Sequence, residues 1–524
     1  MKEKIGIISL GCAKNLVNTE QMMYLLREAG YEISGEIEGA AAVLVNTCGF
    51  IESAKMEAIE TILELGNMKS EGRIGKVIVA GCLAERYKNE VLDEMPEIDA
   101  IVGTGSFDDI VEAVKGALES DVRIDAVAGS GSYDDKIEAV KGALESDARV
   151  DAAAGTGNYD DNVEAAEGAL GTDARIDAAA GTGSFDNIVE AAEGAFENDS
   201  RSVFFGDINA PVSETKRIIS TSTAWAYLKI AEGCDNNCAY CSIPMIRGRF
   251  RSRKMENILS EAAELAQLGY MELIIVAQDI TRYGLDLYGK PMLATLLKEL
   301  CTIKSLKWIR LHYLYPDEID KELVDVIAES DIILKYLDIP IQHINSGILK
   351  KMGRRGTGDD IRELFRTLRE RIPNLVLRTS IITGLPGEGD AEFEELGRFL
   401  TETKIQRAGV FAYSPEEGTP ASLMERPDTE LAAHRAQVLM DIQSRVMDEY
   451  NNSRIGSVET VLIEGRNDSG YYGRSYAESP EIDGYINVEG EGIDIDIDID
   501  IDEFAKVLIT GEKDGELFGV RVLQ

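Results

Sequence analysis

The chain has 524 residues, which is too long for one ordinary domain and predicts two to four. Its 94 Asp and Glu residues outnumber its 54 Lys and Arg residues and give a formal net charge of −40. This charge disfavours binding to bare phosphate backbone and favours basic partners. No stretch reaches the roughly 18 apolar residues that span a bilayer, and the first apolar run is too short for a secretory signal. We therefore expect a cytoplasmic protein that does not associate with a membrane. In such a protein the seven cysteines are expected to bind metal rather than to form disulfides.

Short β-branched runs alternate with helical patterns over residues 1–118. The runs "KIGIISLGC", "AAVLVNTC" and "KVIVAGC" are typical of buried parallel strands, and the alternation predicts a doubly wound α/β domain. Cys12, Cys48 and Cys82 each follow one of these strands. Because ligands collect at the carboxyl edge of such a sheet, three cysteines at the same relative place indicate a metal site.

A 26-residue sequence repeats four times between residues 98 and 201. The first copy is "IDAIVGTGSFDDIVEAVKGALESDVR", and each copy is typical of a strand, a glycine turn and a helix. The later copies replace Ile and Val of the strand with Ala, and none contains Cys or His. We interpret residues 124–201 as an expansion without chemistry, and we expect the first copy to fit the sheet best because its strand is the most β-branched.

Six further strand-like runs alternate with helices between residues 222 and 450. They are "AYLKIAEGC", "ELIIVAQD", "WIRLHYLYP", "KYLDIPIQH", "LVLRTSIITGLPG" and "AGVFAYSPE". Six successive βα units predict a parallel barrel or partial barrel with functional groups at the carboxyl ends of its strands.

The last 70 or so residues lose the helical pattern and predict a small all-β module. Within it "IDIDIDIDID" (493–502) alternates perfectly, which gives a strand one Ile face and one carboxylate face. We interpret this run as a biased edge segment, because it lacks the glycine turn and the ligand spacing of a calcium loop. The predicted division is therefore 1–123, 124–201, a linker 202–221, 222–450 and 451–524.

The stretch "GCDNNCAYC" (233–241) places Cys234, Cys238 and Cys241 just after the first barrel strand. A structural zinc site needs a fourth Cys or His at short spacing, and no histidine of the chain has that spacing. The histidines are His312, His343 and His434. Three thiolates instead suit an iron–sulfur cubane that leaves one iron open, and this spacing is that of the radical S-adenosylmethionine enzymes.

Several motifs in order resemble those of one family within that superfamily, the methylthiotransferases. They are "SLGCAKNLVNTE", "NTCGFI", "AGCLAERY", "GCDNNCAYCSIPMIRGRFRSR", "GLPGE" and "GRSYAESPEIDG". They most resemble the RimO-type branch, which modifies a ribosomal protein. The resemblance extends over the whole chain except the extra repeat copies and the Ile-Asp run, and the C-terminal module resembles a TRAM domain.

The resemblance implies two [4Fe–4S] clusters and S-adenosylmethionine as cofactors. Cys234, Cys238 and Cys241 would hold the cluster that binds S-adenosylmethionine, and Cys12, Cys48 and Cys82 would hold an auxiliary cluster. It also implies a radical mechanism that places a methylthio group on an unactivated carbon. An external electron donor supplies the reducing electron, and a monomer is expected.

Other side chains are weaker candidates. Gln278 and Asp279 end the second barrel strand, where the superfamily contacts the methionine part of its cofactor. A turn that resembles an adenosine contact comprises Gly384, Leu385, Pro386, Gly387 and Glu388. Four alternating arginines either grip a carboxylate or form a solvated basic strand; they are Arg247, Arg249, Arg251 and Arg253. Cys301 is interpreted as a small buried apolar residue, and His343 as a pocket candidate.

Three functions remain open. The first is methylthiolation of an aspartate β-carbon in a basic small-subunit ribosomal protein. The second keeps the chemistry but modifies adenosine in transfer RNA, and the acidic C-terminal module disfavours this RNA binding. The third is an inactive iron–sulfur scaffold whose repeats mediate interactions.

Overall fold

The computed structural model describes residues 2–119, 201–467, 470–489 and 501–522, together with four short strands between 123 and 181. Most of the extra repeat copies and most of the Ile-Asp run therefore lie outside the described residues. The chain divides into two compact units, of which the first holds most of residues 1–206 and the second holds 11–21, 50–53 and 207–524.

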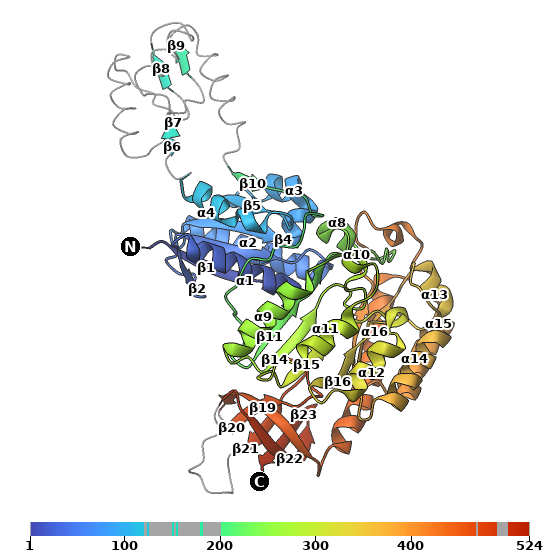
Figure 1. Ribbon diagram of the computed structural model, residues 1–524. Coiled ribbons are helices and arrows are strands. Elements are labelled where there is room, and N and C mark those ends of the chain that lie inside the picture. The colour runs from blue at the N-terminus through green and yellow to red at the C-terminus, as the bar shows by residue number, and fades with distance from the viewer. Residues whose placement is uncertain are drawn as a thin grey trace. The chain divides into compact units, whose positions relative to one another are not determined.

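The first unit contains a six-stranded parallel sheet with strand order β10-β5-β4-β3-β1-β2 (Figure 1). The strands are β1 (Lys4–Ser9), β2 (Glu32–Ser34), β3 (Ala42–Thr47), β4 (Lys76–Gly81), β5 (Ala100–Val102) and β10 (Ser202–Phe204). The helices are α1 (Ala13–Glu28), α2 (Glu52–Ser70), α3 (Cys82–Glu94) and α4 (Ile110–Glu119), and η1 (Phe107–Asp109) is a short 3-10 turn.

Helices cover both faces of this sheet because its central strands are apolar on both sides. Val43 and Val45 of β3 pack with α2 and α3, whereas Ala42 and Leu44 pack with α4 and the second half of α1. All four side chains are fully buried. The predicted doubly wound domain is confirmed.

The first copy of the repeat supplies β5 and α4, and β5 lies between β4 and β10. Four short strands follow, from the end of the first copy onward: β6 (Arg123–Ile124), β7 (Arg149–Val150), β8 (Ala153–Gly155) and β9 (Ala179–Gly181). They pair in parallel, with Arg123 opposite Arg149 and Ala153 opposite Ala179. Each pairing therefore joins positions one repeat length apart.

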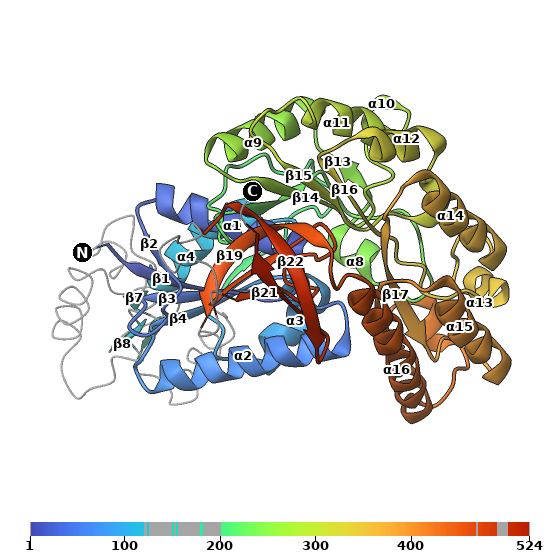
Figure 2. The same cartoon turned by 90° about the horizontal axis from the view of Figure 1, so that it is seen from below.

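The second unit contains a six-stranded parallel sheet whose order follows the chain, β11-β14-β15-β16-β17-β18. The strands are β11 (Trp225–Lys229), β14 (Glu272–Val276), β15 (Trp308–Leu311), β16 (Ile333–Asp338), β17 (Val376–Thr383) and β18 (Arg407–Ala412). Figure 2 shows the helices along the outside of this curved sheet. The predicted partial barrel is confirmed.

The longer helices of this unit are α9 (Met255–Gln267), α11 (Leu293–Leu300), α12 (Lys321–Glu329), α14 (Gly358–Arg371), α15 (Asp390–Thr403) and α16 (Thr429–Ser453). The shorter ones are α8 (Ile243–Arg247), α10 (Leu285–Tyr288), α13 (Ser346–Lys351), η2 (Pro316–Glu318) and η3 (Pro420–Leu423). Among the described helices none is long and apolar enough to cross a membrane.

The C-terminal strands close into a small barrel in the order β19-β20-β21-β23-β22. They are β19 (Val458–Asn467), β20 (Gly470–Arg474), β21 (Ile486–Glu489), β22 (Phe504–Lys513) and β23 (Glu516–Arg521). This is the predicted all-β module. The segment between β20 and β21 contacts inward side chains of the larger sheet, because Tyr227 donates to Glu481 at 2.7 Å and Tyr336 donates to Asp483 at 2.7 Å.

Candidate functional site

The cysteine loop lies between two short strands, β12 (Ala231–Glu232) and β13 (Arg251–Ser252), which pair antiparallel. Gly233 opens the loop with φ of 80°, and a Cβ added there would meet the Arg249 carbonyl oxygen at 2.1 Å. Glycine is therefore required where the loop begins. Within the loop the Cys241 amide donates to the Cys238 carbonyl at 3.0 Å.

The three thiols of this loop are free and half-buried. Cys238 and Cys241 pack against a buried apolar cluster that includes Tyr240, Met352 and Leu385. Burial raises the pKa of the Cys234 thiol to about 11. Holding this sulfur as a thiolate needs a cationic partner, which the iron of an iron–sulfur cluster would provide.

The donor set of this loop fits an iron–sulfur cluster. In a cubane each thiolate binds a different iron, so the three free thiols of Cys234, Cys238 and Cys241 would hold three irons and leave the fourth open. A structural zinc site needs a fourth Cys or His ligand, which this loop does not contain.

Gln278 and Asp279 follow β14 and bond to the base of the cysteine loop. Asp279 is buried, accepts from the Asn236 side-chain amide at 2.7 Å and accepts from the Thr281 amide at 3.0 Å. Gln278 donates to Glu232 at 2.6 Å, and its own carbonyl oxygen has no partner among the described residues. Both residues therefore position the loop, and their contact with a cofactor stays a prediction.

Glu232 is the charged residue at the base of the loop. Although burial raises the pKa of this carboxyl, Lys229 at 3.0 Å and Arg247 at 3.4 Å hold it at about 2. The sequence signal was available, since the mainly apolar run "AYLKIAEGC" contains one lysine and one glutamate, and buried charges need a partner. Sequence reasoning did not single it out.

The turn at residues 384–388 packs on the cysteine loop through Leu385, which is buried in the same apolar cluster. Gly384 has φ of 76°, and an added Cβ would meet the Ala432 side chain at 2.3 Å. Glu388 accepts from Arg435 at 2.9 Å and lies 3.4 Å from His343 Nε2. His343 is fully buried, so it supports the turn from inside. Pro386 and Gly387 complete the turn.

The four alternating arginines have different roles. Arg247 is buried and donates to Asn15 at 2.8 Å and Asn18 at 2.7 Å. Arg253 is buried and pairs with glutamates at 2.6 Å, namely Glu214 and Glu261. These two are not the solvated face of a basic strand. Arg249 is exposed. Arg251 is half-buried, and its guanidinium donates a hydrogen bond to the Arg249 carbonyl at 2.6 Å.

The other cysteine triplet follows adjacent strands of the first sheet. Cys12 lies three residues beyond β1, Cys48 directly after β3, and Cys82 directly after β4. Because β3 pairs in parallel with both β1 and β4, the three strands end at one edge. Gly81 has φ of 100°, and an added Cβ would meet the Thr47 carbonyl at 2.6 Å, so glycine is required before Cys82. The seventh cysteine, Cys301, is half-buried at the end of α11 and contacts Ser330.

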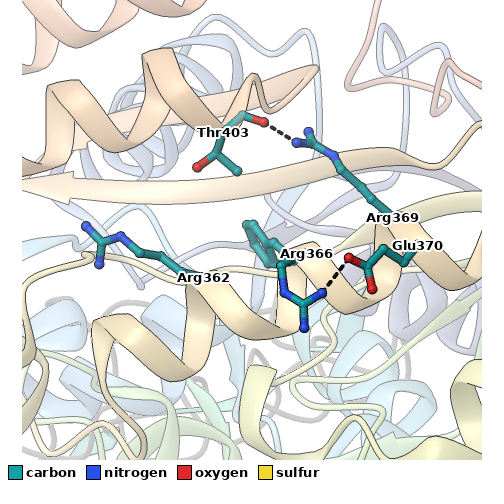
Figure 3. Close-up of a pocket in the computed structure, with 6 residues that line it drawn as sticks. Arg362, Arg366, Arg369, Glu370 and Thr403 are labelled. Atoms are coloured by element: carbon teal, nitrogen blue, oxygen red, sulfur yellow. Dashed lines mark hydrogen bonds and ion pairs between the residues drawn. The ribbon is translucent and has the colours of Figure 1, made fainter.

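A pocket of about 370 Å³ lies on α14, away from both triplets in sequence (Figure 3). Its lining comprises Arg362, Phe365, Arg366, Arg369, Glu370 and Thr403. Arg366 pairs with Glu370 and Arg369 donates to the Thr403 carbonyl, so these arginines are already bonded. None of the predicted site residues lines it, and we assign it no function.

Three family models match the chain. Residues 4–103 match the Uncharacterized protein family UPF0004, residues 228–400 the Radical SAM superfamily, and residues 455–522 the TRAM domain. A protein of Acetivibrio thermocellus named ribosomal protein uS12 methylthiotransferase RimO is 41% identical over 93% of this chain and 92% of its own length. The chain belongs to the RimO family. A family member from Pelotomaculum thermopropionicum is 40% identical over 99% of both chains.

A solved structure that resembles this fold is the radical S-adenosylmethionine methyltransferase TsrM from Kitasatospora setae. It is 14% identical, covers 81% of this chain and 74% of its own, and has a TM-score of 0.48. Membership of the RimO family and of the Radical SAM superfamily confirms the expected enzyme class. It also confirms [4Fe–4S] and S-adenosylmethionine as cofactors.

Proposed function

We propose that the protein transfers a methylthio group to the β-carbon of an aspartate in ribosomal protein uS12. The observation that carries this proposal is 41% identity over nearly the full length of a relative named for that activity. The half-buried thiol loop at the end of the first barrel strand supports it independently.

The proposal assigns the [4Fe–4S] cluster that binds S-adenosylmethionine to Cys234, Cys238 and Cys241. When bound, this cluster supplies the electron for reductive cleavage of S-adenosylmethionine. The chain's own residues hold the loop: Asp279 fixes Asn236, and Gln278 joins Glu232. The apolar side chains around Cys238 and Cys241 keep water out of the reaction.

The auxiliary cluster is assigned to Cys12, Cys48 and Cys82. Its support is the parallel order of β1, β3 and β4, which ends three cysteine-bearing strands at one edge.

The substrate aspartate carries a carboxylate, and Lys14 is the cation that we assign to it. Lys14 is 7% exposed, and its ammonium lies 3.4 Å from the centroid of the Tyr313 ring. No carboxylate of the described chain forms an ion pair with it. Its charged neighbours are first the Cys12 thiol and then Asp338, and Asp338 is paired with Arg378 at 2.9 Å. Tyr313 has φ of 64°, a strained conformation that is common at functional sites.

Charge supports a protein substrate over RNA. Residues 451–524 contain six Lys and Arg against 17 Asp and Glu. Such a module suits a basic ribosomal protein and lacks the positive face that RNA-binding modules use. We further propose that the protein works as a cytoplasmic monomer with an external electron donor.

The test uses protein reconstituted anaerobically with iron and sulfide. We expect about eight irons per chain, from two four-iron clusters. The enzyme should add a methylthio group to a peptide that copies the uS12 loop and leave transfer RNA unmodified, as read by mass spectrometry. Replacing Cys234, Cys238 and Cys241 with Ala should halve the iron and abolish deoxyadenosine formation. Modification of RNA but not peptide would favour the transfer RNA function, and inactivity on both would favour the scaffold.

A further inference from the structure

A buried arginine contacts the cysteine loop from the turn between α13 and α14. Arg354 follows α13 and is 9% exposed. Its Nη1 lies 3.9 Å from Cys238 Sγ and 3.0 Å from the Tyr240 hydroxyl, and its Nη2 donates to the Pro340 carbonyl at 2.7 Å. Two of its contacts are thus in the loop itself, and the third anchors it to the end of β16.

The surrounding chain holds this guanidinium in place. It stacks on the ring of Tyr315, with 4.4 Å from Cζ to the ring centroid, and the Tyr315 hydroxyl also lies 3.9 Å from Cys238 Sγ. The Ala239 amide donates to the Met352 carbonyl at 2.8 Å. The segment that carries Arg354 is therefore bonded to the cysteine loop at several points.

In the part of the chain that the structure describes, no carboxylate neutralises the charge of Arg354. Among the described residues no carboxylate forms an ion pair with it, although it is nearly buried. A buried cation is costly unless a negative group compensates it. The group next to it is Cys238 Sγ, which is a thiolate whenever the loop holds a cluster.

We propose that Arg354 is a positioning residue that raises the reduction potential of the cluster held by Cys234, Cys238 and Cys241. The proposal rests on the assignment of those ligands above. Reduction adds one electron from the external donor without a proton, so the reduced state is the more negative. A guanidinium that donates toward a ligand sulfur stabilises that state more, and hydrogen bonds to cluster sulfurs are a known determinant of potential. The Tyr315 hydroxyl acts in the same direction.

The experiment is a potentiometric titration of the reconstituted full-length protein, followed by electron paramagnetic resonance. The relevant cluster is identified by the change of its signal when S-adenosylmethionine is added. In Arg354→Gln we expect the equilibrium constant for reduction of the cluster to fall about tenfold or more. A tenfold fall lowers the reduction potential by about 59 mV for one electron. Arg354→Lys keeps the positive charge but lacks the planar guanidinium. Its reduction potential should therefore lie between those of Arg354→Gln and the unmodified protein.

Arg355→Gln is the matched control. Arg355 stacks on the same Tyr315 ring at 4.9 Å, but it is 40% exposed and pairs with Asp317 at 2.6 Å and Glu318 at 2.9 Å. Its removal should change the reduction equilibrium less than twofold. An equal shift in both variants would overturn the proposal, because it would show a general charge effect.

Iron content is measured first in every variant. If Arg354→Gln loses iron, the reduction potentials of Tyr315→Phe and Arg354→Lys test the proposal in its place. Tyr315→Phe removes only the hydroxyl that lies 3.9 Å from Cys238 Sγ. Both should then become harder to reduce, and potentials equal to that of the unmodified protein would overturn the proposal. No peptide or RNA is present, so the wrong substrate cannot affect the outcome. Absence of a cluster in the unmodified protein would instead contradict the proposed function.

Discussion

Two cations near the cysteine loops illustrate what single residues contribute. Lys14 and Arg354 are both nearly buried, both lie on a tyrosine ring, and neither forms an ion pair with a described carboxylate. We assign Lys14 to the substrate and Arg354 to a cluster ligand. The two assignments make different predictions, because one affects binding of the peptide and the other affects reduction.

Lys14→Met should weaken use of the peptide substrate. A hydrogen bond between charged groups contributes about 1.5–3 kcal/mol, which corresponds to a rise in KM of about ten- to a hundredfold. Cleavage of S-adenosylmethionine without peptide should stay near its original rate, and Lys14→Arg should recover part of the peptide affinity. The measurement is KM for the uS12 peptide beside deoxyadenosine formation without it. An unchanged KM would contradict the role of Lys14.

The cysteines could be predicted from the sequence, whereas these cations could not. Cys234, Cys238 and Cys241 lie within eight residues, so their spacing alone carries the signal. Arg354 contacts Cys238 across 116 positions, and the local sequence "KKMGRRGTG" is that of any basic surface turn. Interactions this distant depend on strand order, which only the fold determines.

At the level of elements, the segment between β20 and β21 joins the small barrel to the larger sheet through buried charges. Glu478 is 1% exposed and pairs with Arg407 at 3.0 Å and with Arg454. Arg474 of β20 pairs with Glu272 of β14 at 2.8 Å. Although burial raises the pKa of Glu478, the arginines hold it at about 2.

Glu478→Gln should lower the free energy of unfolding by about 3–5 kcal/mol at pH 7, because it leaves the buried Arg407 without a carboxylate and Arg454 with Glu459 alone. A carboxyl with a lowered pKa stabilises the fold above its unfolded pKa of about 4.3 and loses that contribution as the pH falls toward 2. The variant should therefore lose less stability than the unmodified protein over that range. Denaturant titrations at several pH values measure both effects.

The control for this element is Glu489→Gln at the exposed end of β21. Its unfolding free energy should change by less than about 0.5 kcal/mol. If both variants behave alike, the charged segment does not join the two parts as we infer.

The central strands β3, β4 and β14 matched the predicted runs because every one of their residues is buried. Strands such as β2 and β10 have three residues each and no buried side chain, so no apolar run marks them in the sequence. The closure of β19–β23 into a barrel also lay beyond the sequence, since it depends on pairing register.

At the scale of the whole molecule, removal of residues 124–201 should leave a working enzyme of 446 residues. The first repeat copy already supplies β5 and α4, and β10 pairs with β5 directly. The cut joins Arg123 to Ser202 and leaves four residues between α4 and β10, within the usual two to six for such a connection. We expect the same iron content and a similar rate of S-adenosylmethionine cleavage. Loss of iron in this variant alone would show that a later copy completes the domain.

A second deletion of equal length tests whether the domain needs the first repeat copy in particular or any single copy. Removing residues 98–175 also leaves 446 residues, but the remaining copy carries "DAAAG" in place of "DAIVG". Ile101 and Val102 of β5 are fully buried, so their replacement by Ala removes core packing at about 2–5 kcal/mol for the isoleucine alone. This variant should unfold at lower denaturant than the variant without residues 124–201. Equal midpoints would contradict the special fit of the first copy, because the two proteins differ only in which copy pairs with β4.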